Sequence, residues 1–302
     1  GADPNAGFLW EAVYPFTALT GAFGNGESGA RNTPPHQHSL DLARLLLDAG
    51  ADPNDSQTLY NRQWSPNDSH LDLLLHHGLG RGTATVWHKR MGLDHPTPQE
   101  LVEEELRGAA EAGRIERVRM LLSRVRNVDG IGTDHPLLEG RTAHQIAVLH
   151  GHTEIAGLLE QAGAQPKQLT PLEELRAACM RADRTAVDRL LERNPRLAQQ
   201  MSDTWPELLV GLRRLDALRL MVDIGYDLNP TDRRTPLHDA AFHGQLDLVK
   251  TLIELGADPS VRDPDHNSTP LGWAEHAGQH DVARYLSSID GSPSAGRLPS
   301  PQ

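Results

Sequence analysis

The sequence is short of several features, and each shortage limits what the protein can do. Its 302 residues include one cysteine, Cys179, which excludes an internal disulfide framework and a cysteine-rich zinc module. It has no run of about 18 apolar residues, and no charged and apolar leader precedes a small-residue cleavage site. These features predict a soluble protein of a reducing compartment, and we expect the cytoplasm.

Lysine is also scarce. The three lysines are Lys89, Lys167 and Lys250, and the formal net charge is −12. An acidic excess opposes binding to nucleic acid or to anionic lipid, so we expect a protein partner, with no nucleic acid and no membrane. Arginine in place of lysine, together with frequent alanine, indicates a GC-rich and bacterial coding sequence.

What the sequence does contain is a repeated pattern, clearest in "TPLHDAAFHGQLDLVKTLIELGADPS" at 235–260. Thr235 suits the N-cap of a helix and Pro236 its first position, where the missing N–H costs nothing. Gly244 ends this short apolar run, and a second run at helical spacing ends at Gly256. The segment therefore predicts two helices followed by an Asp-Pro turn.

Two short helices cannot bury their apolar faces alone, so such pairs must stack on neighbours. The residues Thr235–Ala240 match the pattern T-P-L-H-x-A, and in this the segment resembles the ankyrin repeat. The resemblance implies an all-α fold, an ankyrin-repeat solenoid of stacked helix-turn-helix units with β-turn fingers.

The same frame fits other segments. They are 106–125, 140–164, 171–195, 204–229 and 268–289, and more weakly 39–54 and 69–78, which fit second helices. Polar, glycine- and proline-rich stretches at about 22–39 and 79–98 indicate two loop insertions. We predict degenerate repeats with these insertions in 1–98, a regular array in 99–290 and a disordered tail in 291–302. "GADPN" at Gly1 returns at Gly50, so we also expect residues upstream.

Histidine is abundant, with 16 residues, and imidazole is a common metal ligand and proton shuttle. His238 and His152 fall on repeat positions that the resemblance explains structurally. His36 and His38 lie on an insertion with no cysteine nearby, and a structural zinc needs four ligands. Cys179 is either a nucleophile or a small packed residue, and its place in the repeat favours packing.

The sequence also has no phosphate-binding glycine loop and no nucleophile elbow. We therefore predict no catalytic residue, no cofactor and no metal. Repetition without chemistry makes a concave surface, and such surfaces usually hold another macromolecule. The leading hypothesis is a protein–protein interaction module or scaffold.

In the ankyrin family, partner contacts come from the turn tips and the exposed end of the inner helix. Aromatic and arginine side chains are favoured as anchors, which ranks Phe242, Arg234 and Arg181 first. The predicted partner-binding residues are Arg181, Asp232, Arg234, Phe242, His243, Asp265, His266 and His276. The wider set on the same positions adds Leu138, Glu139, Arg141, Leu149, His150, Met180, Thr231 and Ser268.

Two alternatives remain open. One is an enzyme or a pathway accessory subunit whose pocket is built by the N-terminal insertions, because long inserted loops are often functional. A pocket that brings together His36, His38, Trp87 and His88 would favour it. The other is a structural part of a longer multidomain polypeptide.

Overall fold

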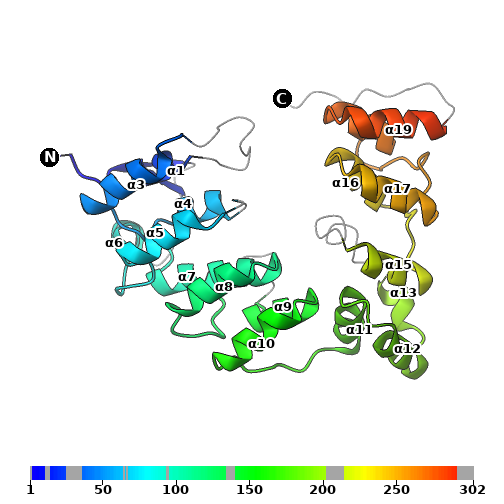
Figure 1. Cartoon of the computed structure of the whole chain (residues 1–302), viewed down its shortest axis with the longest axis horizontal. Coiled ribbons are helices and arrows are strands. Elements are labelled where there is room, and N and C mark those ends of the chain that lie inside the picture. The colour runs from blue at the N-terminus through cyan, green and yellow to red at the C-terminus, as the bar shows by residue number, and fades with distance from the viewer. Residues whose placement is uncertain are drawn as a thin grey trace. The chain divides into compact units, whose positions relative to one another are not determined.

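The structure is a computed structural model that describes residues 2–10, 14–24, 36–63, 65, 67–92, 95–133, 140–201 and 214–290. The chain forms two compact units, Gly1–Lys167 and Gln168–Gln302. Within each unit, helices follow one another in chain order as short antiparallel pairs (Figure 1). The described residues are mostly helical, so the predicted all-α class is confirmed.

Unit 1 begins with a two-stranded antiparallel hairpin, β1 (Gly7–Trp10) and β2 (Tyr14–Thr17). Four helix pairs follow it. They are α1 (Ala18–Phe23) with α3 (Ser39–Asp48), α4 (Ser56–Arg62) with α5 (Ser69–His77), α7 (Pro98–Glu111) with α8 (Ile115–Leu122), and α9 (Ala143–Leu149) with α10 (Thr153–Gln161).

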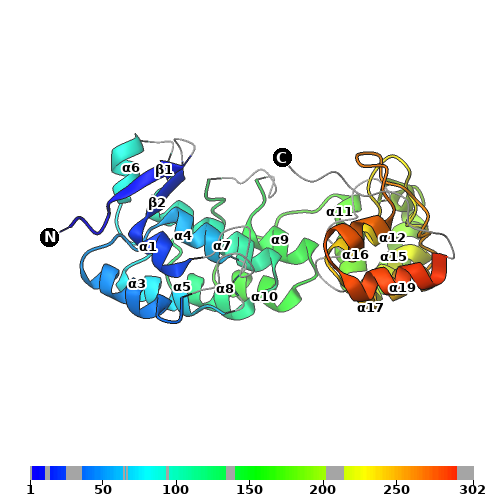
Figure 2. The ribbon, with the colours of Figure 1, turned by 90° about the horizontal axis from the view of Figure 1, so that it is seen from above.

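The connection between α5 and α7 contains one further helix, α6 (Val86–Met91). It lies beside the β-hairpin (Figure 2), where Arg90 donates a hydrogen bond to the carbonyl oxygen of Asn5 at 2.8 Å. The hairpin and α6 were not predicted from the sequence. The segment 79–98 therefore contains α6, and it also contains Thr97, which caps α7.

Unit 2 contains eight described helices. They are α11 (Pro171–Met180), α12 (Arg184–Arg193), α13 (Leu197–Met201), α15 (Leu215–Asp223), α16 (Pro236–Phe242), α17 (Leu246–Glu254), α18 (Pro270–His276) and α19 (His280–Asp290). The first part of the predicted repeat 204–229 and the predicted tail 291–302 lie outside the described residues.

Threonine starts the inner helix of most pairs. Thr142 and Thr235 each accept from the amide three residues later, and the residue at that position bonds back to the threonine. This capping box satisfies amides that the helix leaves unpaired, and a cap of this kind contributes about 1 kcal/mol. Thr97, Thr170 and Thr269 cap α7, α11 and α18.

The turn inside each pair needs a residue with positive φ. Gly151 (φ 73°) and Gly244 (φ 68°) supply it without strain, whereas Ala182 (φ 52°) takes the same conformation between α11 and α12. A side chain in this region is strained by roughly 1–2 kcal/mol. The α11–α12 turn therefore stores strain that the glycine turns avoid.

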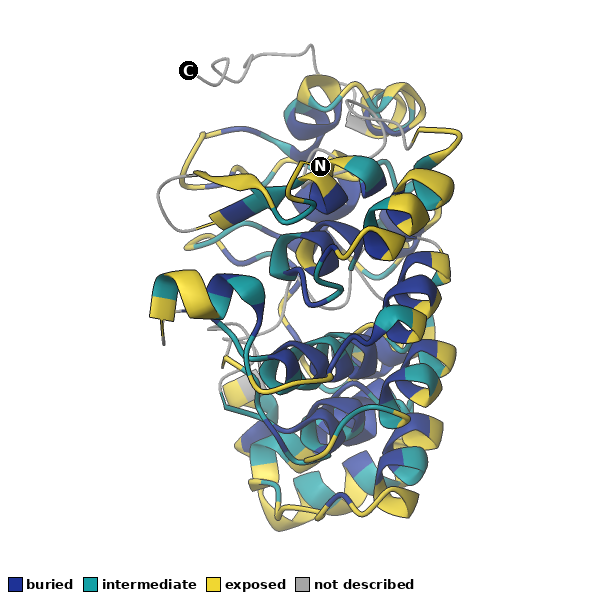
Figure 3. Ribbon diagram, turned by 90° about the vertical axis from the view of Figure 1, so that its left-hand side faces the viewer, coloured by how far each residue is buried: buried dark blue, intermediate teal, exposed yellow. Residues whose placement is uncertain are grey.

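The core of each unit lies between its helices. Leu71, Leu121 and Leu159 are fully buried in unit 1, and Val249 and Leu252 in unit 2. Outer helices such as α17 bury one side, whereas the inner helix α16 is buried at every position from Pro236 to Ala241; Figure 3 colours each helix by burial. Because helices this short bury these residues only against neighbouring helices, stability depends on the neighbouring pair.

None of the helices in the described ranges combines the length and apolar character needed to cross a membrane.

Candidate functional site

The most developed side-chain arrangement in unit 2 surrounds Trp273 on α18. The indole is 8% exposed. Three rings meet it edge-on, with centroid distances of 5.6 Å for Phe242, 5.4 Å for His266 and 6.1 Å for His238. The guanidinium of Arg234 lies over the ring at 5.2 Å. We call these five residues the Trp273 cluster.

Asp263 holds this cluster in place through hydrogen bonds. Its carboxylate accepts the indole N–H of Trp273 at 2.9 Å, and the amide N–H groups of His266 at 2.7 Å and Ser268 at 3.1 Å. Burial alone would raise the pKa of Asp263, but the hydrogen bonds from Trp273, His266 and Ser268 outweigh it and lower the pKa to about 2. The carboxylate is therefore ionised at neutral pH and holds the turn before α18 in one conformation.

His238 joins α16 to the same turn. Its Nε2 donates to the carbonyl oxygen of Ser268 at 3.0 Å, while its Nδ1 lies 2.8 Å from the hydroxyl of Thr235. Burial lowers the pKa of His238, and the Ser268 contact only partly opposes it. A neutral ring can serve both contacts at once, so His238 bridges neighbouring turns, as the resemblance implied.

The structure brings together three of the eight predicted partner-binding residues, Arg234, Phe242 and His266. Phe242 is 36% exposed at the end of α16. Arg234 is less available than the sequence suggested, because it forms an ion pair at 2.7 Å with the buried carboxylate of Asp239. Arg234 therefore stabilises the fold through Asp239 and also lies on the Trp273 cluster.

The other five predicted residues lie around or away from this cluster. His243 is exposed beside Phe242, with ring centroids 5.3 Å apart. Asp265 and His276 are exposed, and Asp232 is exposed and paired with its neighbour. Arg181 ends α11 in a different pair and is half-buried.

Four residues of the wider set are buried rather than presented. They are Leu149, His150, Met180 and Ser268. The expectation that these four residues are exposed is wrong: His150 Nδ1 instead lies 3.2 Å from the carbonyl oxygen of Glu111, and the carbonyl oxygen of Ser268 accepts from His238. Leu138 and Glu139 lie outside the described residues.

Trp273 itself was missed by the sequence analysis. It stands at the variable x position of its repeat, where Asp239 stands in the preceding one. A large aromatic residue at a position that tolerates any side chain was the signal that could have found it.

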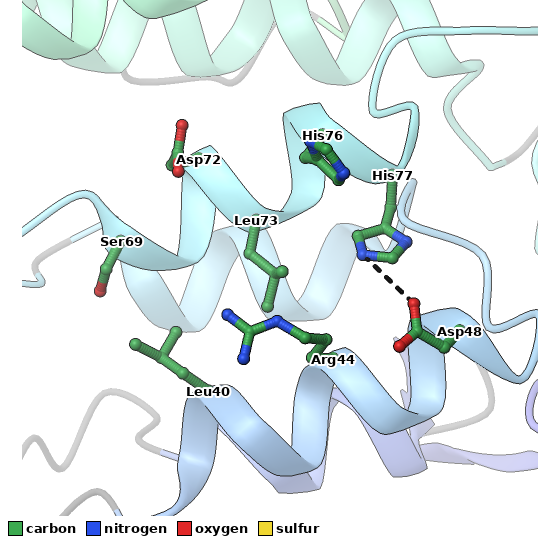
Figure 4. A pocket seen from close by; sticks show the side chains of 8 residues that line it. All are labelled: Leu40, Arg44, Asp48, Ser69, Asp72, Leu73, His76 and His77. Atoms are coloured by element: carbon green, nitrogen blue, oxygen red, sulfur yellow. Dashed lines mark ion pairs between the residues drawn. The ribbon is translucent and has the colours of Figure 1, made fainter.

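A pocket of about 440 Å³ lies between α3 and α5 in unit 1 (Figure 4). Its lining residues are Leu40, Arg44, Asp48, Ser69, Asp72, Leu73, His76 and His77. His77 Nε2 lies 3.8 Å from the Asp48 carboxylate. None of the four residues named for the enzyme alternative lines this pocket, and no three His, Cys, Asp or Glu side chains in the described residues are grouped to hold a metal ion.

Those four residues lie elsewhere in unit 1. Trp87 is buried, with Arg90 over its ring at 4.9 Å. His88 Nδ1 is 2.6 Å from the carbonyl oxygen of His95. His36 and His38 lie next to each other at the start of α3, with ring centroids 5.6 Å apart.

Cys179 is buried on α11. Burial raises the pKa of its thiol to about 12, which keeps the sulfur protonated at neutral pH. Because the thiolate is the nucleophile, this environment fits packing against the neighbouring helices.

Residues 175–294 match the family model described as ankyrin repeats (3 copies). The chain is 24% identical over 281 residues to the ankyrin repeat protein nuc-2 of Neurospora crassa, a match that covers 87% of this chain and 24% of that protein. Shorter stretches are similar to other proteins. Serine/threonine-protein kinase VIK of Arabidopsis thaliana is 47% identical over 60 residues, 20% of this chain and 14% of the kinase.

The Espin-like protein of Homo sapiens is 46% identical over 55 residues, 18% of this chain and 5% of that protein. The matched part thus spans no more than about a quarter of the length of these relatives. Each similarity describes a segment of a much longer protein.

Proposed function

We propose that this chain, which is an ankyrin repeat protein, recognises a partner protein through the Trp273 cluster of unit 2. Ankyrin repeats generally mediate protein–protein interaction, and the stacked pairs provide a continuous surface for it. The cluster adds to that surface an anchor of the kind that dominates interface energetics.

The observation that carries the proposal is the exposure of two rings whose positions are already fixed. Phe242 is 36% exposed and the His266 side chain 44% exposed, yet both pack edge-on against the buried ring of Trp273. Rings held in place before binding lose little conformational freedom when a partner covers them. Truncating such an anchor to alanine typically weakens the binding free energy by about 2 kcal/mol or more, which is about 30-fold in Kd.

We also place this recognition in the bacterial cytoplasm. The support is compositional: arginine replaces lysine at most basic positions, and the single thiol is free and buried. The acidic net charge of −12 favours a partner with a basic contact surface.

The test has two steps. The immobilised chain is cross-linked to partners in a cell extract, which mass spectrometry identifies, and the purified partner is then titrated calorimetrically. Phe242→Ala is expected to weaken binding by about 30-fold. The matched control is Ile289→Ala on α19, an exposed apolar residue (42%) outside the cluster, which is expected to bind like the parent chain.

Phe242 contacts Trp273, so its loss can loosen the fold. Thermal melts of both variants control for this, and His266→Ala provides a second cluster variant whose side chain is more exposed. Unchanged affinity in both cluster variants would remove the cluster from the interface. Equal losses in Phe242→Ala and Ile289→Ala would also contradict the proposal.

A further inference from the structure

Helix α3 repeats the sequence pattern of α17 without repeating its burial. "SLDLARLLLDAGADPN" at 39–54 aligns with "QLDLVKTLIELGADPS" at 245–260 without a gap. Leu42 and Leu45 are 41% and 66% exposed, whereas the aligned Leu248 and Thr251 are 4% and 6% exposed. Two leucines therefore stand in solvent at positions that are buried elsewhere in the same chain.

Helix α5 shows what normally covers these positions. His70 and Leu73 align with Leu42 and Leu45, and both are buried. The ring of His70 meets Phe23 of the preceding pair edge-on, with centroids 6.3 Å apart. Leu73 points toward α3, the outer helix of that pair (Figure 4). In α3 the exposed leucines thus face the side on which a preceding pair would lie.

A hydrogen bond between closing turns sets the register of consecutive pairs. Each outer helix is followed by a closing position, which is Gly50, Gly78, Val125, Gly163, Gly225 or Gly256. The acceptor is the side chain four residues after this closing position. The donor is the backbone N–H two residues after the closing position of the next pair. This contact, the turn clamp, occurs at Asn54–Gly80 (2.7 Å), Asp129–Gln165 (3.2 Å) and Asn229–Asp258 (2.7 Å).

Asn5 makes the same clamp with the first pair. Its Oδ1 accepts the N–H of Asp52 at 2.7 Å, and its Nδ2 donates to the carbonyl oxygen of Gly50 at 2.9 Å. Asn229 makes both contacts, at the same two distances, with the turn after α17. Asn5 therefore has the position and the contacts of the last turn residue of an ankyrin pair.

We propose that the face of α3 that carries Leu42 and Leu45 docks one further ankyrin helix pair, continuous with Gly1, whose closing turn ends at Asn5. The clamp of Asn5 fixes where that pair ends, and the two leucines mark where its helices pack. On this assignment α1 and α3 form an internal pair of the array. The β1–β2 hairpin is then the finger between the added pair and α1.

The chain itself supplies a probe for this face. Residues 235–255 carry α16 and α17 and run into Gly256–Pro259, whose sequence equals that of Gly1–Pro4. Fusing a copy of 235–255 to Gly1 of the full chain places a known pair in the proposed register. Hydrogen exchange is expected to show at least tenfold greater protection of the α3 amides in the fusion, because burial of Leu42 and Leu45 suppresses local opening.

Comparing Leu45→Glu in the unfused and fused chains distinguishes docking of the added pair from a general effect of the substitution on α3. In the unfused chain it is expected to change α3 protection less than twofold, because the side chain is already 66% exposed. In the fusion it is expected to abolish the gain, since a carboxylate would be buried without a partner. Asn5→Ala is expected to reduce the gain by removing the clamp.

Three results would overturn the proposal. The first is a fusion with no gain in α3 protection. The second is a Leu45→Glu effect of equal size in the fused and unfused chains. The third is an unfused chain that sediments as a dimer and becomes monomeric on Leu45→Glu, since a second copy would then cover this face.

Discussion

A buried histidine makes the stability of unit 1 dependent on pH. His70 on α5 is 0% exposed, and neither ring nitrogen has a hydrogen-bond partner of ordinary geometry among the described residues. Burial, followed by the positive charge of nearby arginines, lowers its pKa to about 3, and a backbone contact at Asn67 acts in the opposite direction. The arginines are Arg117, Arg62 and Arg114.

The sign of the effect follows from the two states. In the unfolded chain a histidine has a pKa near 6.5, so folding disfavours the protonated form. The contribution of neutral His70 to the free energy of unfolding is fully present above about pH 6.5 and is lost as pH falls toward 3. At pH 5 the linkage relation gives a loss of about 2 kcal/mol from His70.

The perturbation is His70→Leu, because leucine occupies the aligned position of α17 as Leu248. Urea unfolding of both chains at pH 7.5 and pH 5 is the assay. We expect the variant to be at least as stable as the parent at pH 7.5, since two unpaired buried nitrogens are removed. The difference in free energy of unfolding between variant and parent is expected to be about 2 kcal/mol larger at pH 5 than at pH 7.5, in favour of the variant.

Other groups titrate in the same region. Burial raises the pKa of Glu105 to about 7, and the charge of Arg117 only partly offsets this. Protonation of Glu105 therefore raises the free energy of unfolding as pH falls from 7 toward the pKa of glutamate in the unfolded chain. Glu105 is present in both chains, and the difference between them reports on His70. The matched control is His76→Leu, an exposed position on the same helix. Parallel pH dependence in parent and His70→Leu would refute the reasoning.

Two further predictions concern stability in unit 2. Leu252→Ala is expected to cost about 2–5 kcal/mol in urea unfolding, because the side chain is 0% exposed on α17 and its loss leaves a cavity. A cost below about 1 kcal/mol would contradict the packing. Ala182→Gly is expected to stabilise by about 0.5–1 kcal/mol, because φ is 52° there and glycine removes the strain. A lowered Tm would show that the turn is not strained.

The outer helices of the N-terminal part were predictable because their apolar spacing is strong on its own. The segments 39–54 and 69–78 contain α3 and α5. The inner helix α1 was not predicted, since it has no Thr-Pro start. Its N-cap, Thr17, forms a capping box with Thr20, and the buried carboxylate of Asp55 also accepts the hydroxyl of Thr17 at 2.5 Å from 38 residues away. The contact with Asp55 leaves no local pattern in the sequence, and a capping box without glutamate or proline is a weak helix signal.

The candidate site was predictable at its edge and missed at its centre. Phe242 and His266 lie at a helix end and in a turn, and repeat position alone indicates that such residues are exposed. Trp273 depends on Asp263, ten residues earlier, whose carboxylate accepts the indole N–H. That pairing arises only once α18 and its preceding turn are folded together.

The turn clamp has a consequence for how such a sequence can change over time. Its donor is a backbone N–H, so the hydrogen bond itself requires no particular side chain at the donor position, and glycine, glutamine and aspartate stand there at Gly80, Gln165 and Asp258. Only the acceptor needs a short polar side chain. Neighbouring pairs can therefore drift apart in sequence, or be duplicated and exchanged, while their alignment along the row is preserved.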